Sequence, residues 1–206
     1  MLNTLLPVKD RHPTESAILN SAMSLFLLAG EDSVTVSRLI QTAGISRSVF
    51  YHHFSGKDDL YAAMLLSDEL GIGDMLHRVR RSNDMATLLR ECLKYRIQQI
   101  DKHRLMMRLE TKLASENSTL ERYRQWQRLK RNHMALFAEI ASELLDVDAN
   151  NDDLRFLYGL VWTLADGLAS LRDNELYHEL IQDRRGFSRY LLDSVALIGQ
   201  KSNETR

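Results

Sequence analysis

Proline and cysteine are both scarce in this sequence of 206 residues, which holds two prolines and one cysteine. The single cysteine, Cys92, excludes an intramolecular disulfide framework and any zinc site built from cysteines. Pro7 and Pro13 both lie within the first 13 residues, so the rest of the chain holds no residue that must break a helix. Glycine is scarce as well, with nine residues. These absences favour an all-α fold over a turn-rich β-sandwich or an α/β fold with glycine-rich loops.

Long apolar runs are also absent, because no stretch of about 18 apolar residues occurs anywhere in the chain. The segment Met1–Thr14 has no apolar core of the length that a signal peptide needs. We therefore expect a cytoplasmic protein that does not contact a membrane. The net charge is −1, so a nucleic-acid partner would have to be bound through a local patch.

Charge is distributed unevenly along the chain. Residues 78–133 carry 15 Lys and Arg against 6 Asp and Glu, a net charge of +9. Residues 134–206 carry 7 against 13, a net charge of −6. A ligand recognised by the first of these segments would be anionic. The alternative is that the basic excess balances the acidic segment across a dimer.

Apolar residues recur at intervals of three and four over most of the chain, which predicts helices. Gly30 and Gly44 mark helix ends, and Thr35, Ser46 and Ser55 are suitable N-caps. The predicted helices cover about residues 14–29, 36–43, 47–54, 56–77 with a kink at 71–73, 84–100, 104–115, 119–145, 154–171 and 184–199.

The helices at 36–43 and 47–54 are short and are joined by the tight turn Gly44-Ile45-Ser46, an arrangement typical of a helix-turn-helix. The second helix is too short to be stable alone, so we expect the first to support it. Its outward side chains all form hydrogen bonds: Arg47, Ser48, Tyr51 and His52. Such a helix fits the major groove of DNA. Lys57 lies at the start of the next helix, where a phosphate is favoured.

Residues 14–61 resemble the TetR family of bacterial transcription regulators. The resemblance rests on Phe26, Gly30, Thr35-Val36, Ala43-Gly44-Ile45-Ser46, Phe50-Tyr51-His52-His53-Phe54, Lys57 and Leu60, with a weaker match at Asp166-Gly167-Leu168. It implies a three-helix DNA-binding domain at residues 1–60 and a larger helical domain for ligand binding and dimerisation at residues 61–206. Ile40, Phe50 and Ser37 depart from the usual family residues.

The resemblance also implies roles for individual residues. By position, Ser37, Arg47, Ser48 and Val49 would approach base edges, and Thr35, Tyr51, His53 and Lys57 would contact the DNA backbone. His53 has an alternative role as a buried, hydrogen-bonded histidine, and Arg38 as a surface ion-pair partner.

The helices at 154–171 and 184–199 carry apolar residues over more than one face, so each needs a second partner besides its own core. We expect that partner to be the symmetry-related subunit of a homodimer. The predicted interface residues are Leu157, Val161, Leu164, Leu168, Leu191 and Val195.

A ligand cavity in the second domain would be mainly apolar with a few polar groups. Met106, Trp126 and Trp162 are the candidate ligand-binding residues, although both tryptophans lie on apolar stripes, where a core residue is the commoner case. Arginines near a cavity mouth would select an amphipathic anion: Arg104, Arg108, Arg122 and Arg124. The alternative is that the basic run at 122–131 is a solvated face. We expect Cys92 to be an inert core residue rather than a redox sensor.

Signals of an enzyme are weak. The sequence has no zinc-protease motif, no nucleophile elbow and no complete dinucleotide-binding loop, so we predict neither metal nor cofactor. The resemblance implies a repressor that binds a near-palindromic operator in double-stranded DNA and is released by a small-molecule effector. The alternative is a DNA-bound interaction protein that recruits a protein partner and senses no small molecule, and a helical enzyme ranks third.

Overall fold

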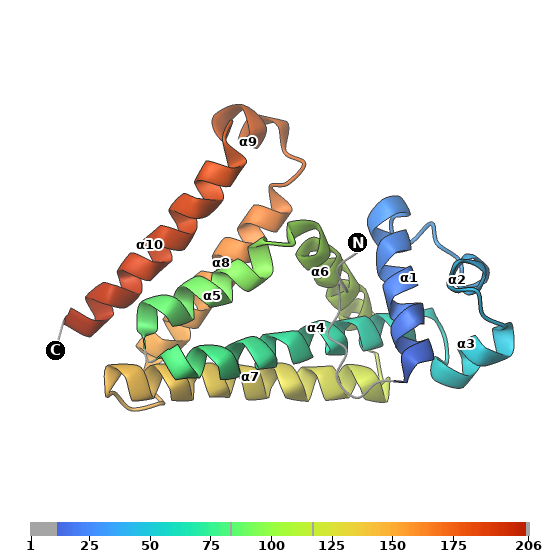
Figure 1. The fold of residues 1–206 in the computed structure, drawn as a ribbon, viewed down its shortest axis with the longest axis horizontal. Helices are drawn as coiled ribbons and strands as arrows, with labels where there is room; N and C mark the ends of the chain where they lie inside the picture. Colours follow the sequence, from blue (N-terminus) through green and yellow to red (C-terminus); the bar gives the residue numbers. More distant parts are fainter. Residues whose placement is uncertain (1–11, 83, 117, 205–206) are drawn as a thin grey trace. The chain divides into compact units, whose positions relative to one another are not determined.

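The computed structural model describes residues 12–82, 84–116 and 118–204 (Figure 1). Pro7 and most of the Met1–Thr14 segment lie outside the described residues. The elements in the described part are helices: α1 (Pro13–Ala29), α2 (Val36–Ala43), α3 (Arg47–His53), α4 (Lys57–Val79), the 3-10 turn η1 (Arg80–Ser82), α5 (Met85–Ile97), α6 (Ile100–Ser115), α7 (Glu121–Leu145), α8 (Asp152–Ser170), α9 (Glu175–Leu180) and α10 (Arg184–Glu204). The prediction of an all-α fold is confirmed.

The chain forms two compact units. The N-terminal unit runs to Gly71 and includes Leu105–Lys130, and the C-terminal unit comprises Ile72–Arg104 and Arg131–Arg206. The division therefore falls within α4, α6 and α7. These compact units differ from the two functional domains expected from the sequence, residues 1–60 and 61–206. The functional division stays a prediction.

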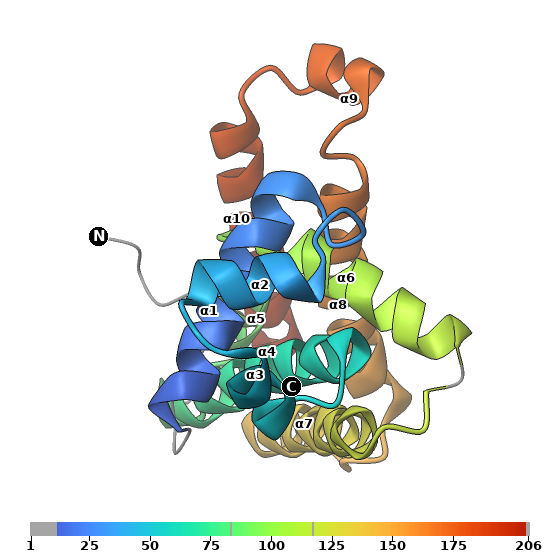
Figure 2. The same ribbon diagram turned by 90° about the vertical axis from the view of Figure 1, so that its right-hand side faces the viewer.

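The core of the N-terminal unit is built around buried aromatic side chains. Phe26 of α1, Phe50 of α3 and Phe54 after α3 are each at most 1% exposed. Leucines and methionines of α1, α4 and α6 fill the space between them. Figure 2 looks onto α1, α2 and α3, the three helices that begin this unit. The core therefore fixes the helix-turn-helix by burying one side of each of its helices.

Local signals set the ends of α2 and α3. Thr35 Oγ1 accepts a hydrogen bond from the Arg38 N–H, and Ser46 Oγ accepts one from the Val49 N–H, each at 3.2 Å. These two bonds satisfy backbone donors in the first turn of each helix. Gly44 ends α2 with φ +65°, a left-handed conformation that glycine adopts without strain. The tight turn predicted from the sequence follows from this geometry.

The core of the C-terminal unit forms where α5 packs against both α8 and α10 (Figure 1). Gly199 of α10 lies against the start of α5, and a Cβ atom added there would be 2.7 Å from the Cα of Ala86. Because that neighbour is backbone, no side chain larger than hydrogen fits without moving α10 away from α5. The glycine near the end of α10 therefore sets how closely the two helices approach.

Several helix bounds differ from the expected ones. The fourth helix continues through Gly71–Gly73, where we expected a kink, because a helix tolerates isolated glycines at a modest cost. The short helix α9 was not predicted, since six residues give too little periodicity to recognise. Among the described residues, no helix combines the length and hydrophobicity needed to cross a membrane.

Candidate functional site

The second helix of the helix-turn-helix, α3, has one polar exposed side and one buried side. Arg47, Ser48, Tyr51 and His52 are exposed, Val49 and His53 are half-buried, and Phe50 is buried. The guanidinium carbon of Arg47 lies 5.6 Å from the ring centroid of Tyr51, within the range of a cation–π contact. The four side chains expected from the sequence to face outward therefore share one exposed surface, which presents several hydrogen-bond donors.

The start of α2 contributes polar groups of its own. Thr35 and Ser37 are exposed. The Thr35 hydroxyl oxygen accepts the capping bond described above, which leaves its proton available to an acceptor outside the protein. Arg38 is exposed as well.

Three histidine rings gather at the end of α3. The His53 ring centroid lies 5.2 Å from that of His52 and 5.3 Å from that of His12. Burial lowers the pKa of His53, and the neighbouring His52, His12 and Arg122 lower it further, against a smaller opposing effect of Glu15. His53 is therefore mainly neutral at pH 7 and can donate a hydrogen bond, but it does not supply a positive charge. No cluster of three or more metal-ligating side chains occurs among the described residues.

The first turn of α4 holds Lys57 next to two carboxylates. The Ser55 N–H donates to Asp59 Oδ2 at 2.8 Å, which closes the turn between α3 and α4. Lys57 is half-buried, and its Nζ lies 5.7 Å from the ring centroid of Tyr61. Lys57 is the first residue of α4, which agrees with its predicted place at the start of this helix.

One residue of this region was not identified from the sequence. Arg122, at the start of α7, donates from Nη1 to the carbonyl oxygen of His53 at 2.9 Å and pairs with Asp59 Oδ2 at 3.1 Å. Its guanidinium carbon also lies 5.0 Å from the ring centroid of Phe54. Arg122 therefore holds the last turn of α3 and the first turn of α4 together. The sequence predicts Arg122 on a solvated face or at a cavity mouth, and these contacts correct both expectations. Helical periodicity gives no signal for contacts with segments so distant in sequence.

The other arginines expected near a cavity mouth also have different roles. Arg108 forms three hydrogen bonds of 2.9–3.2 Å with the buried carboxylate of Glu31. Burial raises the pKa of Glu31, but the hydrogen bonds and charge of Arg108 outweigh it and hold that pKa below its usual value. Arg104 pairs with Asp173, and Arg124 is exposed. These side chains line none of the three cavities described next.

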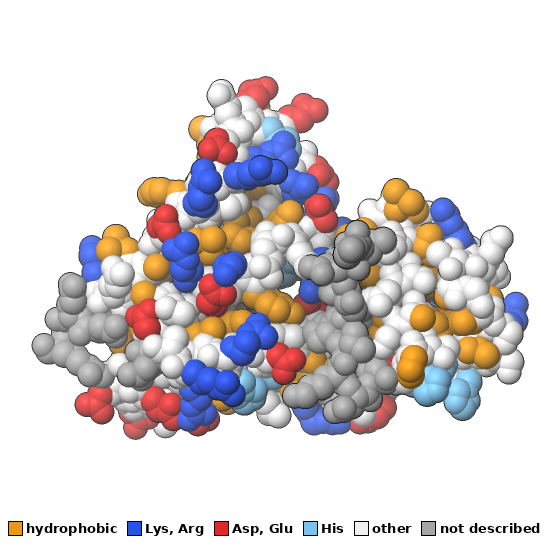
Figure 3. Space-filling view, in the orientation of Figure 1, with side chains coloured by type: hydrophobic (Ala, Val, Ile, Leu, Met, Phe, Trp, Pro, Cys, Tyr) orange, Lys and Arg blue, Asp and Glu red, His pale blue; other side chains and the backbone are white. Residues whose placement is uncertain are grey.

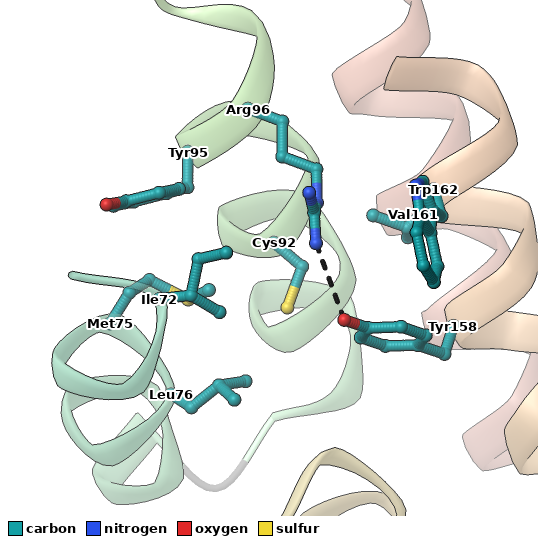
Figure 4. A pocket seen from close by; sticks show the side chains of 9 residues that line it. All are labelled: Ile72, Met75, Leu76, Cys92, Tyr95, Arg96, Tyr158, Val161 and Trp162. Carbon is teal, nitrogen blue, oxygen red and sulfur yellow. Dashed lines mark hydrogen bonds between the residues drawn. The ribbon is translucent and has the colours of Figure 1, made fainter. Parts of the chain in front are cut away.

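Among the described residues, the C-terminal unit lines three cavities that differ in size. The first, shown in Figure 4, is bounded by α4, α5 and α8 and has a volume of about 10 Å³, the space of one water molecule. Its walls are mainly apolar, and they include Cys92 and Trp162. The second, of about 70 Å³, lies among α8, α9, α10 and the junction of α5 with α6. The third, of about 400 Å³, lies between the middle of α7, the loop that follows α7 and the first half of α8.

Two polar groups distinguish the first cavity. Figure 4 shows the Arg96 side chain reaching toward the Tyr158 hydroxyl, to which its Nη2 donates at 3.4 Å. The Arg96 guanidinium carbon also lies 5.7 Å from the Trp162 ring centroid. Burial raises the pKa of the Cys92 thiol to about 12, so this side chain stays protonated and unreactive near neutral pH.

The three candidate ligand-binding residues are not close together. Trp162 lines the first cavity, whereas Met106 and Trp126 are 5% exposed and belong to the core of the N-terminal unit. Trp126 stacks on Tyr123 with ring centroids 5.3 Å apart. Neither Met106 nor Trp126 lines any of the three cavities.

The residues expected at a dimer interface are covered to different extents. Val161 and Val195 are at most 1% exposed in the core of their own subunit. Leu157, Leu164, Leu168 and Leu191 are half-buried. The largest exposed apolar side chains of α8 and α10 are others: Phe156, Tyr190 and Leu197, which are 68%, 66% and 51% exposed.

A helix-turn-helix at the start of an all-helical chain is the architecture of a DNA-binding regulator. Residues 18–64 match the family model described as bacterial regulatory proteins, tetR family. The matched residues, which include α2 and α3, thus have the sequence of a TetR-family helix-turn-helix domain.

The curated relatives match less than half of this chain. The chain is 29% identical over 87 residues to the regulator AcrR of Shigella flexneri, a match covering 41% of this chain and 40% of AcrR. It is 32% identical over 76 residues to the repressor AcnR of Corynebacterium diphtheriae, covering 37% and 38%. The matched region thus spans about two fifths of the length of these relatives.

Solved structures share the fold over most of the chain. The fatty acid degradation regulator FadR from Bacillus halodurans has a TM-score of 0.67 at 15% identity, covering 92% of this chain and 96% of that one. The regulator FadR from Bacillus subtilis, solved in complex with stearoyl-CoA, has a TM-score of 0.57 at 16% identity, covering 87% and 96%. At these identities the likeness is one of fold.

We predict that Arg122→Met lowers the free energy of unfolding by about 1.5–3 kcal/mol, the usual contribution of hydrogen bonds to a charged group. Methionine keeps the long apolar stem but loses the bonds to His53 and Asp59. Urea unfolding monitored by circular dichroism measures the change. The matched control is Arg124→Met, an exposed position on the same helix, which should stay within about 0.5 kcal/mol of the wild type. Equal losses in the two variants would contradict the role given to Arg122.

Proposed function

We propose that this protein is a homodimeric, sequence-specific transcription regulator that binds operator DNA through α3 and represses until a small-molecule effector binds. The observation that carries the proposal is the exposed polar side of α3, with Arg47, Ser48, Tyr51 and His52 opposite the buried Phe50. A helix with one polar exposed side and one buried side can place the exposed side in the major groove while the buried side stays packed on the protein. The family match supports the same function.

The chemistry of the exposed groups separates their roles. Arg47 has a planar guanidinium suited to guanine O6 and N7, and Ser37, Ser48 and Val49 would approach neighbouring base edges. Lys57 at the start of α4 would pair with a phosphate, and Thr35, Tyr51 and His53 would contact the DNA backbone. Because burial and nearby positive charge lower the pKa of His53, that residue would act as a neutral hydrogen-bond donor at pH 7.

We predict different effects for the two cationic residues. Arg47→Ala should cost about 1–3 kcal/mol of binding and weaken the preference at one base pair in each half-site. Lys57→Ala should weaken binding to all sequences alike and lower the salt slope by about one unit per subunit. Binding-site selection and titrations at several salt concentrations measure both effects, with Arg185→Ala in the C-terminal unit as the control. An unchanged sequence preference in Arg47→Ala would mean that α3 is not the reading helix.

A dimer is needed because one seven-residue helix reads only one half-site. Two-fold symmetry would present two copies of α3 to successive major grooves, about 34–36 Å apart. We assign the centre of the interface to the exposed apolar side chains Phe156, Tyr190 and Leu197. The half-buried Leu157, Leu164, Leu168 and Leu191 would lie beneath them, and the buried Val161 and Val195 would support the two helices from within the subunit.

We predict that Tyr190→Asp combined with Leu197→Asp produces a folded monomer, because each added carboxylate would lose its hydration in an apolar interface. Analytical ultracentrifugation measures the oligomeric state, and circular dichroism checks the fold. Leu28→Asp is the matched control, since Leu28 is 81% exposed and belongs to the N-terminal unit. A double variant that remains both folded and dimeric would refute this interface.

For the effector, we propose an amphipathic anion that enters the cavity between α4, α5 and α8. Arg96 supplies a positive charge among apolar walls that include Trp162 and Val161. A regulator of similar fold was solved with stearoyl-CoA. The cavity holds about one water molecule as it stands, so a ligand would have to move the surrounding helices apart. Since α4 lines the cavity and also begins at Lys57, ligand binding and DNA binding would favour different positions of this helix.

We predict that acyl anions, represented by myristate and stearoyl-CoA, raise the thermal stability, whereas the lipophilic cation tetraphenylphosphonium does not. A ligand at 100 times its dissociation constant stabilises by about 2.7 kcal/mol. Thermal-shift measurements detect this, and Arg96→Gln should abolish it while Lys94→Gln, on the same helix, should not. Stabilisation by the cation alone would contradict the anionic effector. No effect of any small molecule on operator binding would favour the alternative, a DNA-bound protein that recruits a partner.

A further inference from the structure

The second cavity of the C-terminal unit combines apolar walls with cationic groups. It lies among α8, α9, α10 and the junction of α5 with α6, and its volume is about 70 Å³. Ile97, Ile100, Leu168 and Tyr177 provide its apolar surface. Its polar lining comes from Arg172, His178, Arg184 and Ser188. Figure 3 shows Lys and Arg side chains below the tip of this unit, with Asp and Glu side chains at the tip and along its edges.

The two arginines of this cavity differ in their state of pairing. Arg172 donates from Nε and Nη2 to the carboxylate of Asp101, at 3.0 and 3.3 Å, so its charge is already balanced. Arg184 forms no ion pair with any residue in the described part of the chain. The cavity therefore offers one uncompensated guanidinium.

A second lining group also lacks a partner. Nδ1 of His178 is buried and has no hydrogen-bond partner within the described residues. A buried polar atom without a partner costs free energy unless a ligand or water satisfies it. Ser188 does not compete for an anion, since its hydroxyl already donates to the carbonyl oxygen of Arg184 at 2.9 Å.

Three acidic groups near the cavity have partners of their own. Asp101 pairs with Arg172, Asp173 pairs with Arg104, and Asp183 Oδ1 accepts from the Gly186 N–H at 2.8 Å. Burial raises the pKa of Tyr177 above its usual value, while the charge of Arg184 lowers it to a lesser degree. Tyr177 therefore stays neutral at pH 7 and adds no negative charge.

We propose that this cavity binds a short aliphatic carboxylate, at a site separate from the effector cavity of Arg96. Arg184 would hold the carboxylate, since a guanidinium donates two parallel hydrogen bonds to such a group. His178 would donate from Nδ1, and the side chains of Ile97, Ile100 and Leu168 would surround the alkyl chain. One uncompensated positive charge matches a carboxylate better than a doubly charged phosphate. The volume fits a chain of a few carbons; an apolar cavity that binds benzene is about 150 Å³.

The proposal is tested by titrating the full-length protein with butyrate and following the methyl resonances of isoleucine and leucine by NMR. Saturable shifts of Ile97, Ile100 and Leu168 are expected, with a dissociation constant on the order of 1 mM for so small a ligand. Butylammonium should give no saturable shifts at these positions, because it would repel Arg184. Inorganic phosphate should bind more weakly than butyrate.

Variants identify the site. Arg184→Gln should weaken butyrate binding at least about tenfold, a difference of 1.4 kcal/mol, and Arg184→Lys should weaken it less because the charge remains. Arg185→Gln, at the next position and exposed as Arg184 is, is the matched control because Arg185 does not line the cavity, and it should bind as the wild type does. Arg96→Gln should also leave butyrate binding unchanged, which separates this site from the proposed effector cavity.

Four results would overturn the proposal. These are the absence of saturable shifts, equal losses in Arg184→Gln and Arg185→Gln, loss of binding in Arg96→Gln alone, and tighter binding of inorganic phosphate than of butyrate. Thermal unfolding checks that each variant is folded. If Arg184→Gln does not fold, the folded Arg184→Lys variant decides the question, because undiminished butyrate binding there would exclude a bidentate contact.

Discussion

The proposed DNA-reading surface depends on holding a helix of seven residues in place. A helix this short is unstable alone, because nucleation costs more free energy than its few hydrogen bonds return. Burial of Phe50 and Phe54 attaches α3 to the core of the N-terminal unit, and the Ser46 cap fixes its first turn. Arg122 fixes its last turn through the His53 carbonyl. Since the buried residues and the two ends hold the helix, its exposed side chains are available to contact DNA.

The parts of this arrangement that are local in sequence could be predicted. The caps Thr35 and Ser46, the left-handed Gly44 and the alternation of buried and exposed positions along α3 all act within a few residues. Their pattern gave the helix-turn-helix and the bounds of α2 as the structure has them. The end of a helix is a weaker signal when no glycine or proline marks it, which is why the break between α5 and α6 was expected several residues later.

Contacts between distant segments could not be predicted. Arg122 lies 69 residues from His53, and Arg108 lies 77 residues from Glu31, so no spacing rule connects them. The tryptophans illustrate the same limit. Both lie on apolar stripes, yet Trp126 belongs to the core of one unit and Trp162 lines a cavity of the other. Helical periodicity identifies which side of a helix is buried, but it does not identify which neighbours cover that side.

Charge balance within one subunit narrows the choice of anion-binding residues. The basic excess of residues 78–133 suggested many cationic ligand contacts, with neutralisation across a dimer as the alternative. In the C-terminal unit, Arg80 pairs with Glu139 and Glu143, and Arg90 with Asp193. Arg104 pairs with Asp173 in the same way, whereas Arg108, Lys112 and Arg122 pair with acidic residues of the N-terminal segment. Part of the basic excess is therefore compensated within the same chain, without a partner subunit. Net charge along the sequence is thus a poor guide to a ligand site, because paired charges have little long-range effect in salt. A cationic side chain that lines a cavity is a better indication of an anion-binding site. Arg96 and Arg184 each line a cavity.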